Sequence, residues 1–65
     1  MHMKIKLDNN NYLEVDIYND NLVSFSIKAR RDEGSVVLVT AYLDSRSLDD
    51  LISNLVSVRP KVKDE

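Results

Sequence analysis

Hydrophobic and polar residues alternate along the first two thirds of the chain, in four runs separated by short polar segments. Alternation with a period of two is typical of β-strands that bury one face. The pattern predicts strands at residues 3–8, 12–18, 22–31 and 35–43. The intervening segments are rich in Asn, Asp and Gly, which favour tight turns. We therefore expect a four-stranded antiparallel meander.

The relative positions of these strands can be predicted from the turns. Three-residue turns at 9–11, 19–21 and 32–34 would each end in Asn or Gly, the residues that favour a left-handed conformation there. With these turns the apolar residues of all four strands fall on one face, which a slip of one residue would reverse. The predicted pairs are Ile5 with Val15, Leu7 with Leu13, Val15 with Phe25, and Ile27 with Val39.

After Leu43 the hydrophobic spacing changes to that of an α-helix. Ser47 is a candidate N-cap, and Asp49 and Asp50 would lie in the first turn, where acidic residues suit the helix dipole. The pattern predicts a helix at 47–58, and Pro60 marks its end. Its apolar stripe consists of Leu48, Leu51, Ile52, Leu55 and Val58. The expected fold is α+β, with this C-terminal helix packed on the apolar face of the meander.

The strand at 35–43 differs from the others because it is apolar on both faces. One face joins the core, and the other would remain exposed on a strand that is also an edge of the sheet. No lysine or proline protects this edge, although monomeric proteins commonly have such protection. We therefore expect an interface here, formed with a second copy or with a partner protein that adds a strand. Its predicted residues are Val36, Leu38, Thr40 and Tyr42, with Tyr18 and Leu22 farther across the same face.

The length of the chain also favours association. Sixty-five residues (1–65) make one small domain, whose core supplies only a few kcal/mol. Domains of this size commonly gain stability from disulfides, a metal or a partner subunit. Because the chain has no cysteine and its only histidine is His2, we expect no disulfide, no zinc site and no cofactor. Association with a partner subunit is the remaining route.

The two ends of the chain carry little predicted structure. Met3 is a candidate natural start, which would make Met1-His2 an appended remnant, and the charged residues 60–65 are expected to fray. No apolar run approaches the roughly 20 residues of a transmembrane helix, and no signal peptide opens the chain. We therefore expect a cytoplasmic protein without a membrane partner.

The sequence gives little support for catalysis. Its serines have no histidine beyond the terminal one to act as a base. Glu14 and Asp16 share a strand face, but nearby lysines and arginines are expected to pair with them. A non-enzymatic protein is the better interpretation.

Nucleic-acid or nucleotide binding is the alternative hypothesis. Lys28, Arg30 and Arg31, together with Tyr12 on the same sheet face, could contact phosphates and stack on bases. The net charge of −2 argues against it, because nucleic-acid binders usually carry a basic excess.

No family motif is recognisable in the sequence. Its small size and its use of Asn, Asp, Lys and Ile resemble small accessory proteins of phages or mobile elements from low-GC bacteria. The leading hypothesis is a homodimeric interaction module that binds another protein. For a phage-encoded protein, inhibiting or redirecting a host protein in the host cytoplasm would be a natural role.

Overall fold

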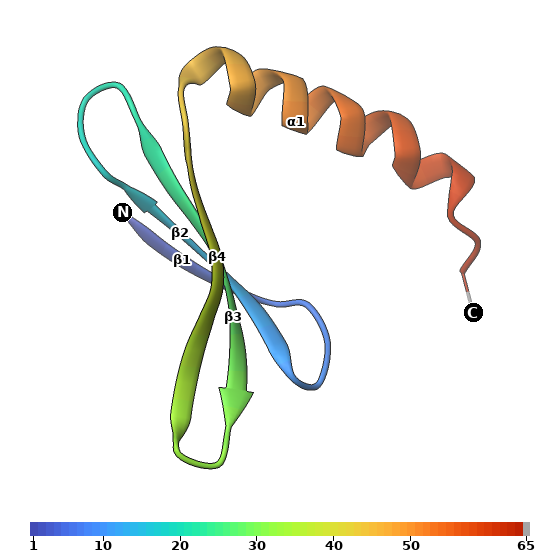
Figure 1. Cartoon of the computed structure of the whole chain (residues 1–65). Helices are drawn as coiled ribbons and strands as arrows, with labels where there is room; N and C mark the ends of the chain where they lie inside the picture. Colours follow the sequence, from blue (N-terminus) through green and yellow to red (C-terminus); the bar gives the residue numbers. More distant parts are fainter. Residues whose placement is uncertain (65) are drawn as a thin grey trace.

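The computed structural model describes residues 1–64 and has the predicted α+β architecture, one antiparallel four-stranded sheet followed by a C-terminal α-helix (Figure 1). The elements are β1 (His2–Lys6), β2 (Asn11–Ile17), β3 (Val23–Arg31), β4 (Gly34–Leu43), α1 (Ser45–Val58) and a short 3-10 turn, η1 (Arg59–Lys61). The strands lie in the sheet in the order in which they occur in the chain, so the predicted meander is confirmed.

The first hairpin has a different register from the predicted one. Ile5 pairs with Leu13 rather than with Val15, because Asp8 belongs to the turn and not to the strand. The Asp8 carboxylate accepts hydrogen bonds from the backbone N–H groups of Asn10 and Asn11, at 2.8 and 2.9 Å. The hydrogen bonds from Asn11 and Asn10 also lower the pKa of Asp8. Because the shift is of two residues, the apolar side chains stay on the predicted face.

The predicted pairing of β2 with β3 is confirmed, as is that of Ile27 with Val39 between β3 and β4. A β-bulge then shifts the register so that Lys28 pairs with Val37 and Leu38 is the extra residue. Beyond the bulge, Arg31 pairs with Gly34, leaving a two-residue turn in place of the predicted three.

Gly34 has the expected positive φ, at +124°, but no other residue of 1–64 has one, so the left-handed conformations predicted for Asn11 and Asn21 are wrong. The turns that contain these two residues are instead held by side chains. Asp8 fixes the first, and the Asn19 side-chain oxygen accepts from the Asn21 backbone N–H at 2.8 Å in the second. Such Asx-type turns do not need a left-handed residue.

The helix starts two residues before the predicted position, and Asp44 is its N-cap rather than Ser47. The Ser47 backbone N–H donates to Asp44 Oδ1 at 2.9 Å, and this bond lowers the pKa of the Asp44 carboxyl. Asp44 is also the only residue between β4 and α1. Pro60 lies just beyond the helix, two residues after Val58, and is part of η1.

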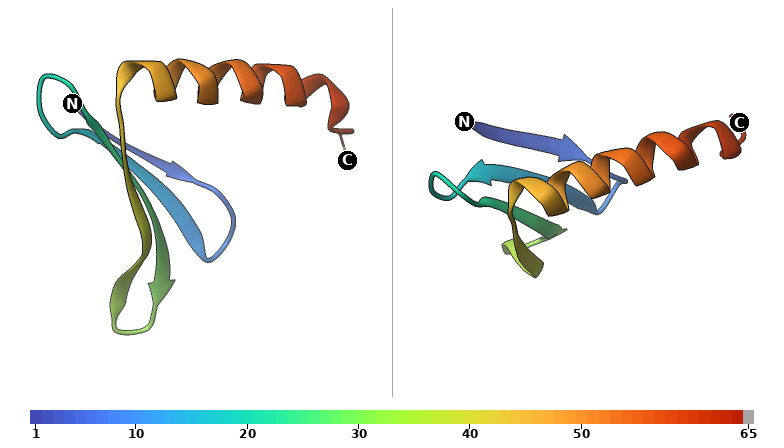
Figure 2. Two further views of the ribbon diagram at one scale, coloured as in Figure 1. Left: turned by 45° about the horizontal axis from the view of Figure 1, so that its top comes forward. Right: turned by 90° about the horizontal axis from the view of Figure 1, so that it is seen from above.

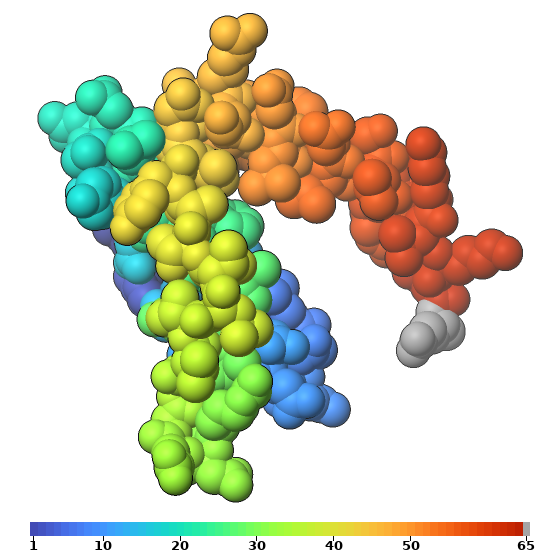
Figure 3. Space-filling model, in the orientation of Figure 1, coloured from blue at the N-terminus to red at the C-terminus, as the bar shows by residue number. Residues whose placement is uncertain are grey.

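Only the first half of α1 reaches the sheet. Figure 2 shows the helix leaving the end of β4 and extending past the strands, so that it covers the sheet at one end only. Leu48 and Leu51 are half-buried, whereas Ile52, Leu55 and Val58 are exposed. The open angle between helix and sheet is visible in the space-filling view (Figure 3).

The open angle leaves the chain without a closed core. Among residues 1–64, the only buried hydrophobic residues are Tyr12 and Ala29. The radius of gyration is 13.6 Å, compared with about 10.7 Å for a compact domain of this length. The fold is therefore formed, but its apolar face is left largely open to water.

Candidate interaction site

An apolar groove with a volume of about 440 Å³ lies between the sheet and α1. Its walls come from the apolar face of the first three strands and from the apolar stripe of the helix. The groove is lined by Met1, Met3, Ile5, Leu13, Val15, Ile17, Val23, Phe25, Leu48, Leu51, Ile52 and Leu55, with Asp16 as its one charged residue. Such a lining can bind apolar surface and offers almost no polar group for catalysis or for orienting a polar ligand.

Both walls of the apolar groove carry exposed apolar side chains. Ile17 on the sheet is 61% exposed and Leu55 on the helix is 60% exposed. Water in contact with such surface is unfavourable by about 25 cal/mol per Å². Because the helical stripe predicts a helix packed on this face, the groove could not be predicted from the sequence. The useful signal was Asp44, whose position directly after the strand makes the connection to α1 very short.

The predicted interface on the outer face of β4 is only partly assembled. The rings of Tyr18 and Tyr42 contact each other edge to face, with centroids 4.8 Å apart. Leu38 is exposed at the bulge. Leu22, which lies close to Tyr18 in the sequence, is half-buried. Thr40 forms a hydrogen bond with Ser26, at 3.0 Å between the hydroxyl oxygens.

The face predicted for Val36 is wrong. Val36 pairs with Ala29, so it lies on the same side of the sheet as the groove, while Val37 takes the outer position opposite Lys28. The bulge at Leu38 is the cause, because an extra residue reverses the alternation of side chains on one side of it.

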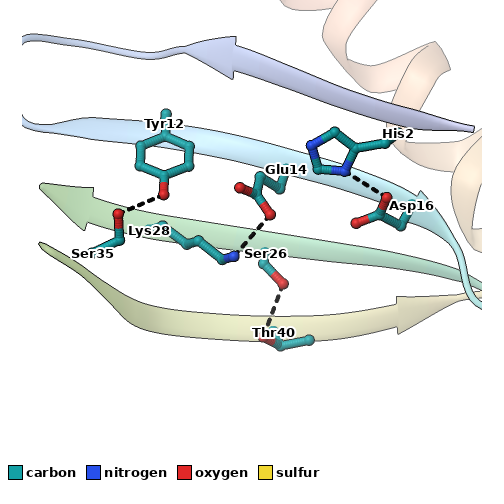
Figure 4. Close-up of polar contacts among 8 residues, drawn as sticks. All are labelled: His2, Tyr12, Glu14, Asp16, Ser26, Lys28, Ser35 and Thr40. Atoms are coloured by element: carbon teal, nitrogen blue, oxygen red, sulfur yellow. Dashed lines mark hydrogen bonds and ion pairs between the residues drawn. The ribbon is translucent and has the colours of Figure 1, made fainter.

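The outer face of the sheet is polar, and its side chains are paired with one another (Figure 4). Each contact joins two strands. The pairs are His2 with Asp16 at 2.6 Å, Glu14 with Lys28 at 2.8 Å, Ser26 with Thr40 at 3.0 Å, and Tyr12 with Ser35 at 2.7 Å. The hydrogen bond to Glu14 raises the pKa of Lys28. Several polar side chains of this face are therefore paired within the chain, whereas many apolar side chains of the groove remain exposed.

The residues of the alternative, nucleic-acid hypothesis do not form one open platform. Tyr12 is only 5% exposed, with the Lys4 ammonium 4.3 Å from its ring centroid and the Arg30 guanidinium 5.7 Å away. Lys28 is already paired with Glu14. Arg31 lies opposite Gly34, on the other face of the sheet from its neighbour Arg30. The tyrosine is thus covered, and the cations are separated or neutralised.

One cluster of metal-ligand type was not predicted. Potential ligand atoms of His2, Glu14 and Asp16 lie within 4.8 Å of one another, brought together by the pairing of His2 with Asp16 across β1 and β2. A histidine and two carboxylates can bind a divalent cation. Here, however, Glu14 holds the Lys28 ammonium, which a cation would have to displace.

No protein family, curated protein or solved structure matches this chain. No helix within residues 1–64 has the length and apolar character needed to cross a membrane. A proposal for the function of this chain therefore rests on the apolar groove.

Proposed function

We propose that this protein is a non-enzymatic protein-interaction module that works as a homodimer. The observation that carries the proposal is the apolar groove, which is open to solvent, whereas Tyr12 and Ala29 are the only buried hydrophobic residues within 1–64. A folded chain of this kind gains most by covering that groove with another apolar surface.

The exposed area has the size that a stable dimer requires. The chain exposes 5583 Å², whereas a compact monomer of 7.5 kDa would expose about 4,250 Å². The excess of about 1,300 Å² exceeds the ~800 Å² that each partner buries in a standard interface. Two copies that buried this excess would form an interface in the range of obligate homodimers.

Light scattering over a dilution series tests the proposal. We expect a mass of twice 7.5 kDa that persists on dilution. Leu55→Asp places a charge on the exposed part of the groove and should give a monomer, because an unpaired charge is costly to bury. Ser57→Asp is the matched control, since Ser57 lies about 200° around the helix from Leu55 and should leave the dimer intact. A wild-type monomer at all concentrations would overturn the proposal.

A second variant tests the outer face of β4, the surface on which the sequence placed self-association. Leu38→Lys should leave the mass unchanged if the groove forms the dimer, because Leu38 lies outside the groove. A monomeric Leu38→Lys protein would instead favour pairing through β4. With the dimer formed at the groove, the contact between Tyr18 and Tyr42 and the exposed Leu38 remain available for a different protein. If the protein is a phage or mobile-element accessory protein, this surface is where a host protein would bind.

A further inference from the structure

Each copy of the chain carries two apolar surfaces that lack a covering layer, one on the sheet and one on the helix. We infer that two copies associate by exchanging α1, so that the helix of each copy crosses β1 and β2 of the other. This inference rests on the proposed homodimer and specifies how its groove is filled.

The short connection between β4 and α1 limits how far the helix can fold over its own sheet. Asp44 is the single linking residue, and its side chain is committed to the Ser47 N–H at 2.9 Å. A connection of one residue offers few backbone torsions that could turn α1 down onto the sheet. The helix leaves the end of β4 at an open angle and diverges from the strands along its length of about 21 Å (Figure 2).

The exposed part of the helix stripe lies beyond the point where α1 and the sheet diverge. Leu48 and Leu51, in the first half of the helix, are half-buried by the chain itself. Ile52, Leu55 and Val58 continue the same stripe at helical spacing and are more than half exposed. Their spacing is that of helices that pack on another element, and their own sheet does not reach them.

The apolar face of the sheet also lacks a covering layer. Met3, Ile5 and Ile17 lie on the apolar face of β1 and β2 and are exposed, although the pattern of the strands is that of a buried face. A second copy related by a two-fold axis supplies a helix to this face and receives one in return. Such an interface uses the same two surfaces in both copies and therefore closes after two chains.

A second copy accounts for the exposed surface better than a small apolar molecule does. The groove volume of about 440 Å³ lies within the range of small-molecule pockets. A ligand of that size would sit inside the groove and leave Val58, which does not line it, exposed to water. The excess area of about 1,300 Å² also matches a polypeptide interface rather than a ligand.

Disulfide trapping between differently tagged copies tests the exchange, since the chain has no cysteine of its own. One copy carries Leu55→Cys, and the other carries Met3→Cys, Ile5→Cys or Ile17→Cys in three separate experiments. The two copies are mixed in denaturant, refolded together and mildly oxidised. We expect at least one of the three pairs to form a disulfide between the two chains in most of the mixed dimers. Ser57→Cys replaces Leu55→Cys as the control and should trap at least tenfold less, because Ser57 faces away from the stripe.

The outcomes separate the exchange from the proposed homodimer. A dimer by light scattering in which none of the three pairs is trapped would overturn the exchange and leave the homodimer standing. In the double variant Leu55→Cys with Ile5→Cys, oxidation at high dilution should link chains rather than close a loop within one chain. A disulfide formed mainly within single chains would show that α1 folds back on its own sheet, and would also overturn the exchange. A monomer, with or without a bound apolar molecule in native mass spectrometry, would overturn both.

Discussion

Tyr12 on β2 donates a hydrogen bond to Ser35 on β4, with 2.7 Å between the two oxygens, and so reaches across β3, which lies between them. Tyr12 is also the most buried aromatic residue in residues 1–64, although it belongs to the polar face of the sheet. The Lys4 ammonium covers its ring. The side chains named here on the polar face thus find partners within a single chain, whereas the apolar face lacks a covering layer.

Removing the Tyr12 hydroxyl should weaken the sheet measurably. Tyr12→Phe keeps the ring and its contact with Lys4 but leaves Ser35 without its partner. We expect the free energy of unfolding to fall by about 1 kcal/mol, the usual net value of one hydrogen bond. Urea titration measures this change, and Tyr42→Phe, at an exposed ring, is the control and should have little effect. Equal losses in the two variants would show that the bond to Ser35 has no special role.

The strand pattern could be predicted from the sequence because the spacing of apolar residues determines which face each side chain occupies. The spacing of apolar residues could not determine the register of the first hairpin, since a shift of two residues leaves the faces unchanged. The side chain of Asp8 decides that register through its bonds to Asn10 and Asn11. The bulge at Leu38 could not be predicted either, because it depends on the two-residue turn that begins after Arg31.

The helix was predicted from its stripe, but its direction was not. Periodicity identifies the apolar side of a helix and gives no information on the angle at which the helix leaves the preceding strand. That angle depends on Asp44, which combines the roles of linker and cap. A helix about 10 Å across is also narrower than four strands spaced about 4.8 Å apart, so incomplete cover could be anticipated. The apolar groove follows from this difference between the width of the helix and the width of the sheet.

The cap at Asp44 should make the helix sensitive to acid. Its pKa is lowered in the folded chain by the hydrogen bond from the Ser47 N–H, from an ordinary value of 3.8. A lowered pKa contributes stability above the unfolded value, and this contribution disappears as the pH falls through the folded value. We expect helix content, measured by circular dichroism, to decrease below about pH 4.

Asp44→Asn is the matched variant for this experiment, because asparagine caps helices without a titrating group. Its helix content should depend less on acid than that of the wild type. Identical acid transitions in the two proteins would show that other carboxyl groups control the loss of helix. Asp44→Ala should reduce helix content at neutral pH as well, since it removes the acceptor for the Ser47 N–H.

The pair formed by Lys28 and Glu14 should produce the opposite dependence, at alkaline pH. The hydrogen bond to Glu14 raises the pKa of Lys28 above its ordinary value of 10.5. A raised pKa contributes stability that is complete below the unfolded value and is lost as the pH rises through the folded value. Urea midpoints should therefore decrease above about pH 10.5 in the wild type. Lys28→Met should remove most of this decrease, and Lys6→Met, the control, should retain it.

Gly34 should be the least replaceable residue of the last hairpin. Its φ of +124° lies in a region that L-amino acids rarely adopt, and no atom beyond Gly34 and its two chain neighbours lies within 4 Å of the position that a Cβ would take. Gly34→Ala should therefore lower the free energy of unfolding by about 1 kcal/mol or more through backbone strain, without a steric clash. Because the chain is short enough for chemical synthesis, D-alanine at position 34 provides the matched control. A D-residue favours positive φ, so this variant should be at least as stable as the wild type. If L- and D-alanine destabilise the protein equally, the conformation of Gly34 does not determine how β3 and β4 pair, and the bond between Tyr12 and Ser35 must hold that register instead.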